Sequence, residues 1–245
     1  MGTLFQTVQG SWVSSQLSQE EIRREISKAQ VVLTDLDDTD AVSPAKILAR
    51  EHVQRGAKHH ARYLSWVVRS SWKKYHQGKS SETEIWKEYV DTFLKSKSQR
   101  IRAGEYFDER NVQQLLFPGV QDFYRALPPT YKSYITRNIS EVARAFSSVV
   151  GIDSIVAETP NKGIATEQFI QSNPWFQNYI IKGDSEEDEE MMRVAEHYKK
   201  KGSIKTVTSI LVCENKNTPL EKATIHIGRD YRGLVELMTS KKQAL

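Results

Sequence analysis

The sequence has one cysteine, Cys213, among 245 residues, which excludes an intramolecular disulfide and a zinc site made of cysteines alone. It has no apolar run of the roughly 18 residues that a membrane helix needs, so no membrane span is expected. The first residues lack a basic stretch followed by an apolar one, so no secretory signal is expected either. Repeats of roughly 20–50 residues and low-complexity tracts are also absent. Together these absences favour a reducing cytoplasm as the location.

What the sequence does contain is the composition of a folded protein. Hydrophobic residues make up 38% and charged residues 27%, which is too apolar for a disordered chain. The 35 Lys and Arg exceed the 31 Asp and Glu by 4, but the excess is unevenly placed. Residues 40–118 hold 15 of the basic and 9 of the acidic residues, a net charge of +6, so the remainder carries −2. This shift in composition suggests an inserted module whose surface attracts anions.

Hydrophobic periodicity predicts alternating strands and helices outside that module. Short apolar runs predict strands at 31–35, 131–136, 154–158, 179–183, 206–213 and 223–227. Amphipathic spacing predicts helices at 16–29, 108–116, 120–127, 140–149, 163–171, 186–200 and 231–241, and a helical bundle from 44 to about 110. The first helix has Ser18 and Glu21 at the spacing of a capping box. This order implies a three-layer α/β sandwich of the Rossmann-like class, with a mainly parallel sheet.

The residues that follow the predicted strands are unusually polar. In an open parallel sheet, ligands bind at the carboxyl ends of the strands. After the first strand come Asp35, Asp37, Asp38, Thr39 and Asp40, and after the later strands come Thr136, Arg137, Asn138, Lys162, Asp184 and Asp188. Crowded carboxylates repel one another, and oxygen ligands without His or Cys suit Mg²⁺. A metal, a lysine and a hydroxyl around one point can receive a phosphoryl group, which a carboxylate can attack.

Four of these positions resemble the motifs of the haloacid dehalogenase-like (HAD) phosphohydrolases. The segment Asp35–Thr39, DLDDT, is similar to their DxDx[T/V] motif, and Thr136 resembles the second motif. Lys162 resembles the third motif, and Gly183-Asp184-Ser185 with Asp188 resembles the acidic fourth. The resemblance covers roughly residues 30–240. It implies a core at 30–39 and 118–245, a helical cap at 40–117 and an N-terminal extension at 1–29 that carries an amphipathic helix.

The resemblance also implies a role for each motif residue. Asp35 would be the nucleophile and a Mg²⁺ ligand, and Asp37 would be the general acid/base and a ligand through its backbone carbonyl. Asp184 and Asp188 would complete the metal site. Thr136 and Lys162 would bind the phosphoryl group, helped by backbone N–H groups near Leu36 and at Arg137. The presence of Asp37 favours a phosphate ester over a carbon–halogen bond.

Three features allow more than one interpretation. Asp40 stands where the family usually has an apolar residue, so it would either repel an anionic substrate or face solvent at the hinge. Asp188 lies in the first turn of a predicted helix, where an acid also complements the helix dipole. The basic segment 46–79 contains aromatic residues, a pattern found in nucleic-acid binding. It equally suits a cap with an aromatic core and a wet basic face that guides a small phosphorylated substrate, which we favour.

The sequence therefore predicts Mg²⁺-dependent hydrolysis of a small phosphate monoester through an aspartyl-phosphate intermediate. The position of the cap resembles that of phosphoglycolate phosphatase-like members. One alternative is a phosphomutase or phosphotransferase with the same intermediate. Another is a non-catalytic binding protein that uses the basic cap. A membrane partner is not expected, and the sequence does not indicate the oligomeric state.

Overall fold

The computed structural model describes residues 3–6, 11–44, 47–48, 97–213 and 223–240. Most of the predicted cap, including the basic segment 46–79 apart from residues 47 and 48, lies outside the described residues. No helix within the described ranges is long and apolar enough to cross a membrane.

The structure is built on one eight-stranded sheet with the strand order β1-β2-β8-β7-β6-β3-β4-β5. The strands are β1 (Thr3–Gln6), β2 (Trp12–Ser15), β3 (Val31–Thr34), β4 (Tyr131–Ile135), β5 (Ser154–Val156), β6 (Asn178–Gly183), β7 (Thr206–Val212) and β8 (Ile225–Ile227). The strands from β8 to β5 pair in parallel, whereas β1 and β2 are antiparallel to their neighbours. The predicted mainly parallel sheet is therefore confirmed, and β3 lies between β4 and β6.

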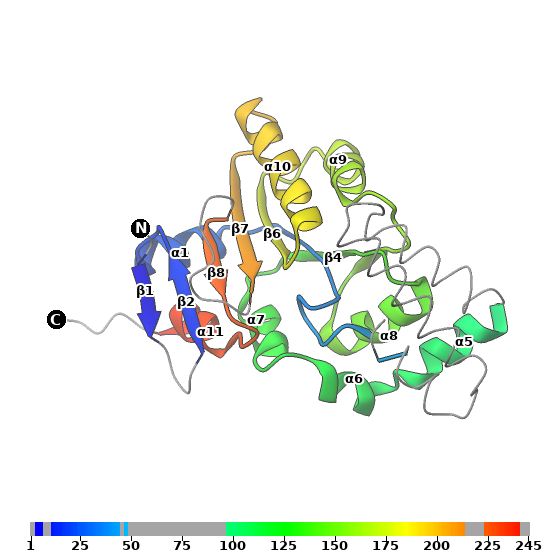
Figure 1. Cartoon of the computed structure of the whole chain (residues 1–245). Helices are drawn as coiled ribbons and strands as arrows, with labels where there is room; N and C mark the ends of the chain where they lie inside the picture. The colour runs from blue at the N-terminus through cyan, green and yellow to red at the C-terminus, as the bar shows by residue number, and fades with distance from the viewer. Residues whose placement is uncertain (1–2, 7–10, 45–46, 49–96, 214–222, 241–245) are drawn as a thin grey trace, which may run out of the picture.

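Helices cover both faces of the sheet (Figure 1). The covering helices are α1 (Gln19–Ser27), α7 (Val120–Ala126), α8 (Ser140–Val150), α9 (Lys162–Ser172), α10 (Glu186–Lys200) and α11 (Arg232–Thr239), whereas α5 (Lys97–Tyr106) and α6 (Glu109–Leu115) pack on α8. Alternation along β3 explains the layers, because successive side chains of a strand point to opposite faces. Val32 packs with α1, α7 and α11, whereas Val31 and Leu33 pack with α9 and α10. The three-layer sandwich is thus confirmed.

Two short strands at the N-terminus were not predicted. β2 is only four residues long, with the sequence WVSS, and pairs with β8 through Val13 and Ile227. Its paired serines hide the alternation that reveals longer strands. The helix that follows begins at Gln19 rather than at residue 16, and its predicted capping box of Ser18 and Glu21 is confirmed. Ile22 and Ile26 are buried.

The chain leaves the core after β3 and returns to it before α7, and these two connections lie side by side. Ala41 and Leu116 form an antiparallel bridge. The amide of Phe117 donates to the carbonyl of Asp40 at 2.9 Å. Just before this return, α5 and α6 pack on α8 of the core, where Phe107 and Val112 join the core cluster of Phe146.

Candidate active site

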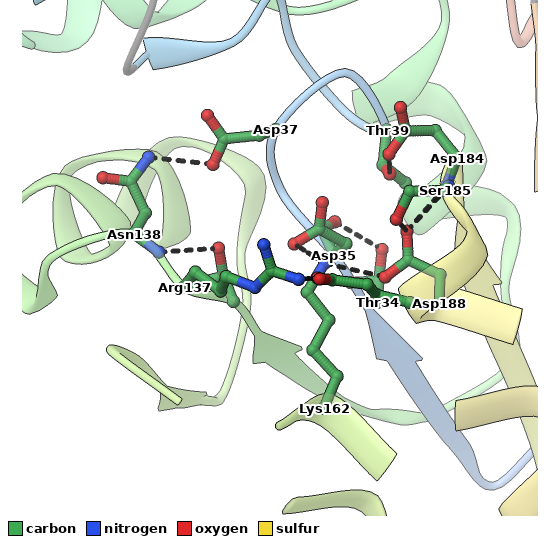
Figure 2. Close-up of polar contacts among 12 residues, drawn as sticks. Thr34, Asp35, Asp37, Thr39, Arg137, Asn138, Lys162, Asp184, Ser185 and Asp188 are labelled. Atoms are coloured by element: carbon green, nitrogen blue, oxygen red, sulfur yellow. Dashed lines mark hydrogen bonds and ion pairs between the residues drawn. The ribbon is translucent and has the colours of Figure 1, made fainter. Parts of the chain in front are cut away.

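The central contact of the site joins Asp35, just after β3, to Lys162, the first residue of α9. Lys162 Nζ lies 2.8 Å from Asp35 Oδ1 and 2.7 Å from Asp188 Oδ1. All three side chains are buried, with exposed fractions of 6%, 4% and 0%. Figure 2 shows this contact between Arg137 on one side and Asp184 with Asp188 on the other. The topology causes this convergence, because β3, β4 and β6 are parallel neighbours that end at the same edge.

The loop after β3 is shaped by its own backbone. The amide of Asp35 donates to the carbonyl of Lys182 on β6 at 3.1 Å. Asp38 has a φ of 54°, in the left-handed region that aspartate tolerates better than most residues. This turn brings Thr39 back to the site, where its Oγ1 donates to Asp184 Oδ1 at 3.3 Å. The loop thus links the ends of β3 and β6 through side chain and backbone together.

Asp35, Asp184 and Asp188 form a cluster in which one oxygen from each carboxylate lies within 4.8 Å of the others. Burial and the nearby carboxylates raise the pKa of Asp35 to about 7, although the positive charge of Lys162 opposes this rise. Burial and the charges of Asp188 and Asp35 raise the pKa of Asp184 to about 9. Burial alone would lower the pKa of Lys162, but Asp188 and Asp35 outweigh it and raise that pKa. A divalent cation would relieve the remaining repulsion, so this donor set fits Mg²⁺.

Both interpretations of Asp188 have a structural basis. Its Oδ2 accepts hydrogen bonds from the amide of Asp184 at 2.9 Å and from Ser185 N and Oγ at 3.0 and 2.8 Å. It therefore closes the capping box of α10 as well as the carboxylate cluster. Burial favours its neutral form, but Lys162 and these hydrogen bonds outweigh that effect and lower the pKa of Asp188. A Cβ atom on Gly183 would lie 2.1 Å from Asp188 Cβ, so only glycine fits before Asp184.

Asp37 lies apart from this cluster and is held by Ser43, which the sequence analysis did not name, and by Asn138, which it placed at this edge without a role. Its Oδ1 accepts from Ser43 Oγ at 2.7 Å, and its Oδ2 accepts from Asn138 Nδ2 at 2.9 Å. The backbone N–H of Asn138 donates to Oγ1 of the fully buried Thr136 at 3.2 Å. The signal for Asn138 was its place two residues after Thr136, at the end of β4.

Comparison with known proteins gives a result at the level of structure only. No protein-family model matches the sequence, and no curated protein matches it. The structure is similar to that of cytosolic 5′-nucleotidase IIIB bound to cytidine, with a TM-score of 0.55, 11% identity, and 90% of this chain and 89% of that chain covered. Substrate-bound phosphoserine phosphatase gives a TM-score of 0.52 at 14% identity, with 86% of this chain and 99% of that chain covered. A HAD family hydrolase from Salmonella enterica serovar Typhi gives 0.54 at 13% identity, with 91% of this chain and 74% of that chain covered.

This chain has the HAD-like fold. The resemblance seen in the sequence is confirmed at that level, and the four motif segments lie at the carboxyl edge of the sheet. Leu36 is fully buried within the first of them. Arg137 makes an ion pair with Glu187 of α10. Arg137, Glu187 and Lys162 line an open cleft of about 470 Å³ beside the carboxylate cluster.

Asp40 corrects the sequence analysis. We predicted that it would repel an anionic substrate or face solvent, and both predictions are wrong. Its side chain is fully buried, forms an ion pair with Lys182 and accepts a hydrogen bond from Tyr124 Oη at 2.7 Å. Lys182 is 142 positions away in the sequence, so no local pattern indicated the pairing. A buried charge is tolerated when such a partner compensates it.

Proposed function

We propose that this protein is a Mg²⁺-dependent phosphatase that hydrolyses a small phosphate monoester through an aspartyl-phosphate intermediate. The observation that carries the proposal is the buried contact of 2.8 Å between Asp35 and Lys162 inside a cluster of carboxylates. A lysine so placed balances the charge that gathers when a carboxylate attacks a phosphoryl group. The HAD-like fold supports the same chemistry.

The metal would be held by Asp35, Asp184 and the backbone carbonyl of Asp37. Asp188 would contribute through water, because its oxygens already accept hydrogen bonds from Lys162, Asp184 and Ser185. When bound, Mg²⁺ neutralises charge on the phosphoryl oxygens and orients them. The oxygen-only ligand set and the raised pKa values of Asp35 and Asp184 support this assignment.

The chain's own residues would perform two displacements at phosphorus. An Asp35 oxygen attacks phosphorus as the bond to the ester oxygen breaks, and Asp37 donates its proton to the leaving alcohol. Asp37 then takes a proton from water, whose oxygen attacks the same phosphorus and releases phosphate and free Asp35. Thr136 and the backbone amides near Leu36 and at Arg137 would hold the phosphoryl oxygens.

A small soluble metabolite is the substrate class that we propose. Two structures with the same fold are a phosphoserine phosphatase with substrate and a nucleotidase with cytidine. We also retain the proposals of a cytoplasmic location and of a helical cap at 40–117 whose basic face guides the anion.

The test is phosphate release from a panel of small phosphomonoesters, with Mg²⁺ or with EDTA. Asp35→Asn should abolish release while the protein stays folded. The matched control is Asp122→Asn, because Asp122 is 61% exposed and pairs only with Arg125 among the contacts described. Phosphate release by Asp35→Asn at the wild-type rate would overturn the assignment of Asp35 as the nucleophile.

Product analysis separates the alternatives. Transfer of phosphate to an added alcohol in preference to water would identify a phosphotransferase. No release with any ester, combined with salt-dependent binding to nucleic acid that is lost on neutralising Lys73 and Lys74, would identify a binding protein instead.

A further inference from the structure

A second charged cluster lies behind the site and has no access to solvent. Asp40 and Lys182 are both fully buried and form an ion pair. Lys182 Nζ also lies 4.6 Å from the ring centres of Tyr124 and Tyr231 and 5.0 Å from that of Phe123. A cation enclosed by aromatic rings and one carboxylate is held in one place by all of them.

Three tyrosine hydroxyls complete the shell around Asp40. Its Oδ2 accepts from Tyr124 Oη at 2.7 Å and from Tyr134 Oη at 3.3 Å. Tyr231 Oη lies 3.3 Å from Asp40 Oδ1 and donates to the backbone carbonyl of Thr39 at 2.9 Å. Tyr231 is therefore the hydroxyl that connects this cluster to the loop after β3.

The members of the cluster are bonded directly to the residues of the site. The carbonyl of Lys182 accepts from the amide of Asp35, at 3.1 Å. Thr39, held by Tyr231, donates in turn to Asp184, which follows Lys182 by two positions. A displacement of Lys182 or Thr39 would thus move the nucleophile and a metal ligand together.

The fold alone does not require a charged pair here. Replacing a buried ion pair with apolar side chains of similar size is often neutral or stabilising, so its presence is weak evidence for a stabilising role. Such a pair can instead fix one arrangement, because separating the two charges would leave each of them buried without compensation. The ion pair joins Lys182 on β6 to Asp40, at the end of the loop that carries Asp35.

We infer that Asp40, Lys182 and Tyr231 are positioning residues that hold the loop of Asp35–Thr39 against β6. The inference rests on the proposed function for its effect on turnover. It also has a consequence that does not depend on turnover, because Thr39 and Asp184 lie beside the metal site. Positioning of such groups is worth a large factor, since an error of about 1 Å costs up to about 100-fold in rate.

The decisive comparison is Tyr231→Phe with its matched control Tyr124→Phe. Each variant removes one hydroxyl that contacts Asp40, but only Tyr231 also holds the Thr39 carbonyl. We expect Tyr231→Phe to lower kcat about ten-fold with KM within about two-fold. It should also weaken Mg²⁺ binding about ten-fold by calorimetry, as loss of a group behind a metal ligand does. Tyr124→Phe loses a hydrogen bond to Asp40 but no contact with the Thr39 carbonyl, so its effect on kcat and on Mg²⁺ affinity should be clearly smaller than that of Tyr231→Phe.

A double variant tests the ion pair itself. In Asp40→Asn/Lys182→Met the new amide oxygen can accept from Tyr124 and Tyr134, and the amide nitrogen can donate to Tyr231. The fold should therefore survive, with a melting temperature above that of Asp40→Asn alone, which leaves the ammonium uncompensated. We expect its kcat to remain at least about three-fold below wild type. A double variant with the wild-type kcat would show that the charges do not serve the site.

The outcomes separate this inference from the proposed function. Equal effects of Tyr231→Phe and Tyr124→Phe on both kcat and Mg²⁺ affinity would overturn the positioning role. A wild-type protein that releases no phosphate would overturn the phosphatase alone. In that case unequal Mg²⁺ affinities of the two variants would still support the positioning role. A wild-type protein that neither releases phosphate nor binds Mg²⁺ would overturn both.

Discussion

Gly183→Ala is the substitution whose effect the structure defines most closely. The added methyl carbon would lie 2.1 Å from Cβ, 2.3 Å from Cγ and 2.5 Å from Oδ2 of Asp188. None of these contacts is compatible with van der Waals radii, so the Asp188 side chain must leave its position. It then gives up the bond from Lys162 at 2.7 Å and those from Asp184 and Ser185.

The loss of stability follows from the contacts that Asp188 gives up. A hydrogen bond to a charged group contributes about 1.5–3 kcal/mol, and breaking a buried ion pair costs about 3–5 kcal/mol. Because these contacts are lost together, we expect the free energy of unfolding to fall by about 3–5 kcal/mol. For a chain of this length that corresponds to a decrease in Tm of roughly 6–20 °C. Activity should fall as well, since Lys162 loses one of its two carboxylate partners.

The assay is thermal and urea unfolding of Gly183→Ala beside Gly202→Ala. Gly202 has a φ of 77° but nothing within 4 Å of its Cβ position, so it reports backbone strain without a clash. That strain costs about 1–2 kcal/mol. If Gly183→Ala proved no less stable than Gly202→Ala, the packing of Asp188 against Gly183 would be wrong.

Further predictions concern proton binding by Asp35 and Asp184, the proposed acid/base residue Asp37, and the ion pair of Asp40 with Lys182. The pKa values of Asp35 and Asp184 are raised in the fold, to about 7 and about 9. The metal-free fold therefore binds more protons than the unfolded chain between about pH 4 and 9, and its stability should decrease as pH rises through that window. Mg²⁺ competes with those protons, so its affinity by calorimetry should increase from pH 6 to pH 9; a constant affinity would contradict the site. Asn138→Ala, which removes the hydrogen bond to Asp37 Oδ2 and leaves that from Ser43, should lower kcat roughly ten-fold with little change in KM; an unchanged kcat would show that Asn138 does not position Asp37. Asp40→Asn should lower the free energy of unfolding in urea by about 3–5 kcal/mol, whereas a neutral result would mean that Lys182 is not charged.

Much of the fold was predictable because its signals are local. Runs such as VVL and YII are apolar on both sides, which is typical of strands buried between two helical layers. The four motif residues converge because each follows a strand of one parallel sheet. Their order along the chain was therefore enough to predict their meeting, but not the distances between them.

The features that were missed depend on contacts between distant residues. The partner of Asp40 comes from β6, and no property of the segment around Asp40 distinguishes a buried aspartate from an exposed one. The role of Asn138 toward Asp37 likewise joins two loops, 101 positions apart. The sequence of β2, WVSS, is short and half polar, so it gives little signal of a strand by itself. β2 forms because the edge of β8 is available to pair with it.

The pairing of β2 with β8 has a consequence for how the chain folds. Val13 and Ile227 are paired although 214 positions separate them. During synthesis β1 and β2 emerge early and can pair with each other, but β2 cannot join the rest of the sheet until β8 has been made, near the end of the chain. Closing so long a loop is slow, because its entropic cost comes before the reward of pairing. We therefore expect the N-terminal strands to join the sheet last, as the final step that completes an already folded core.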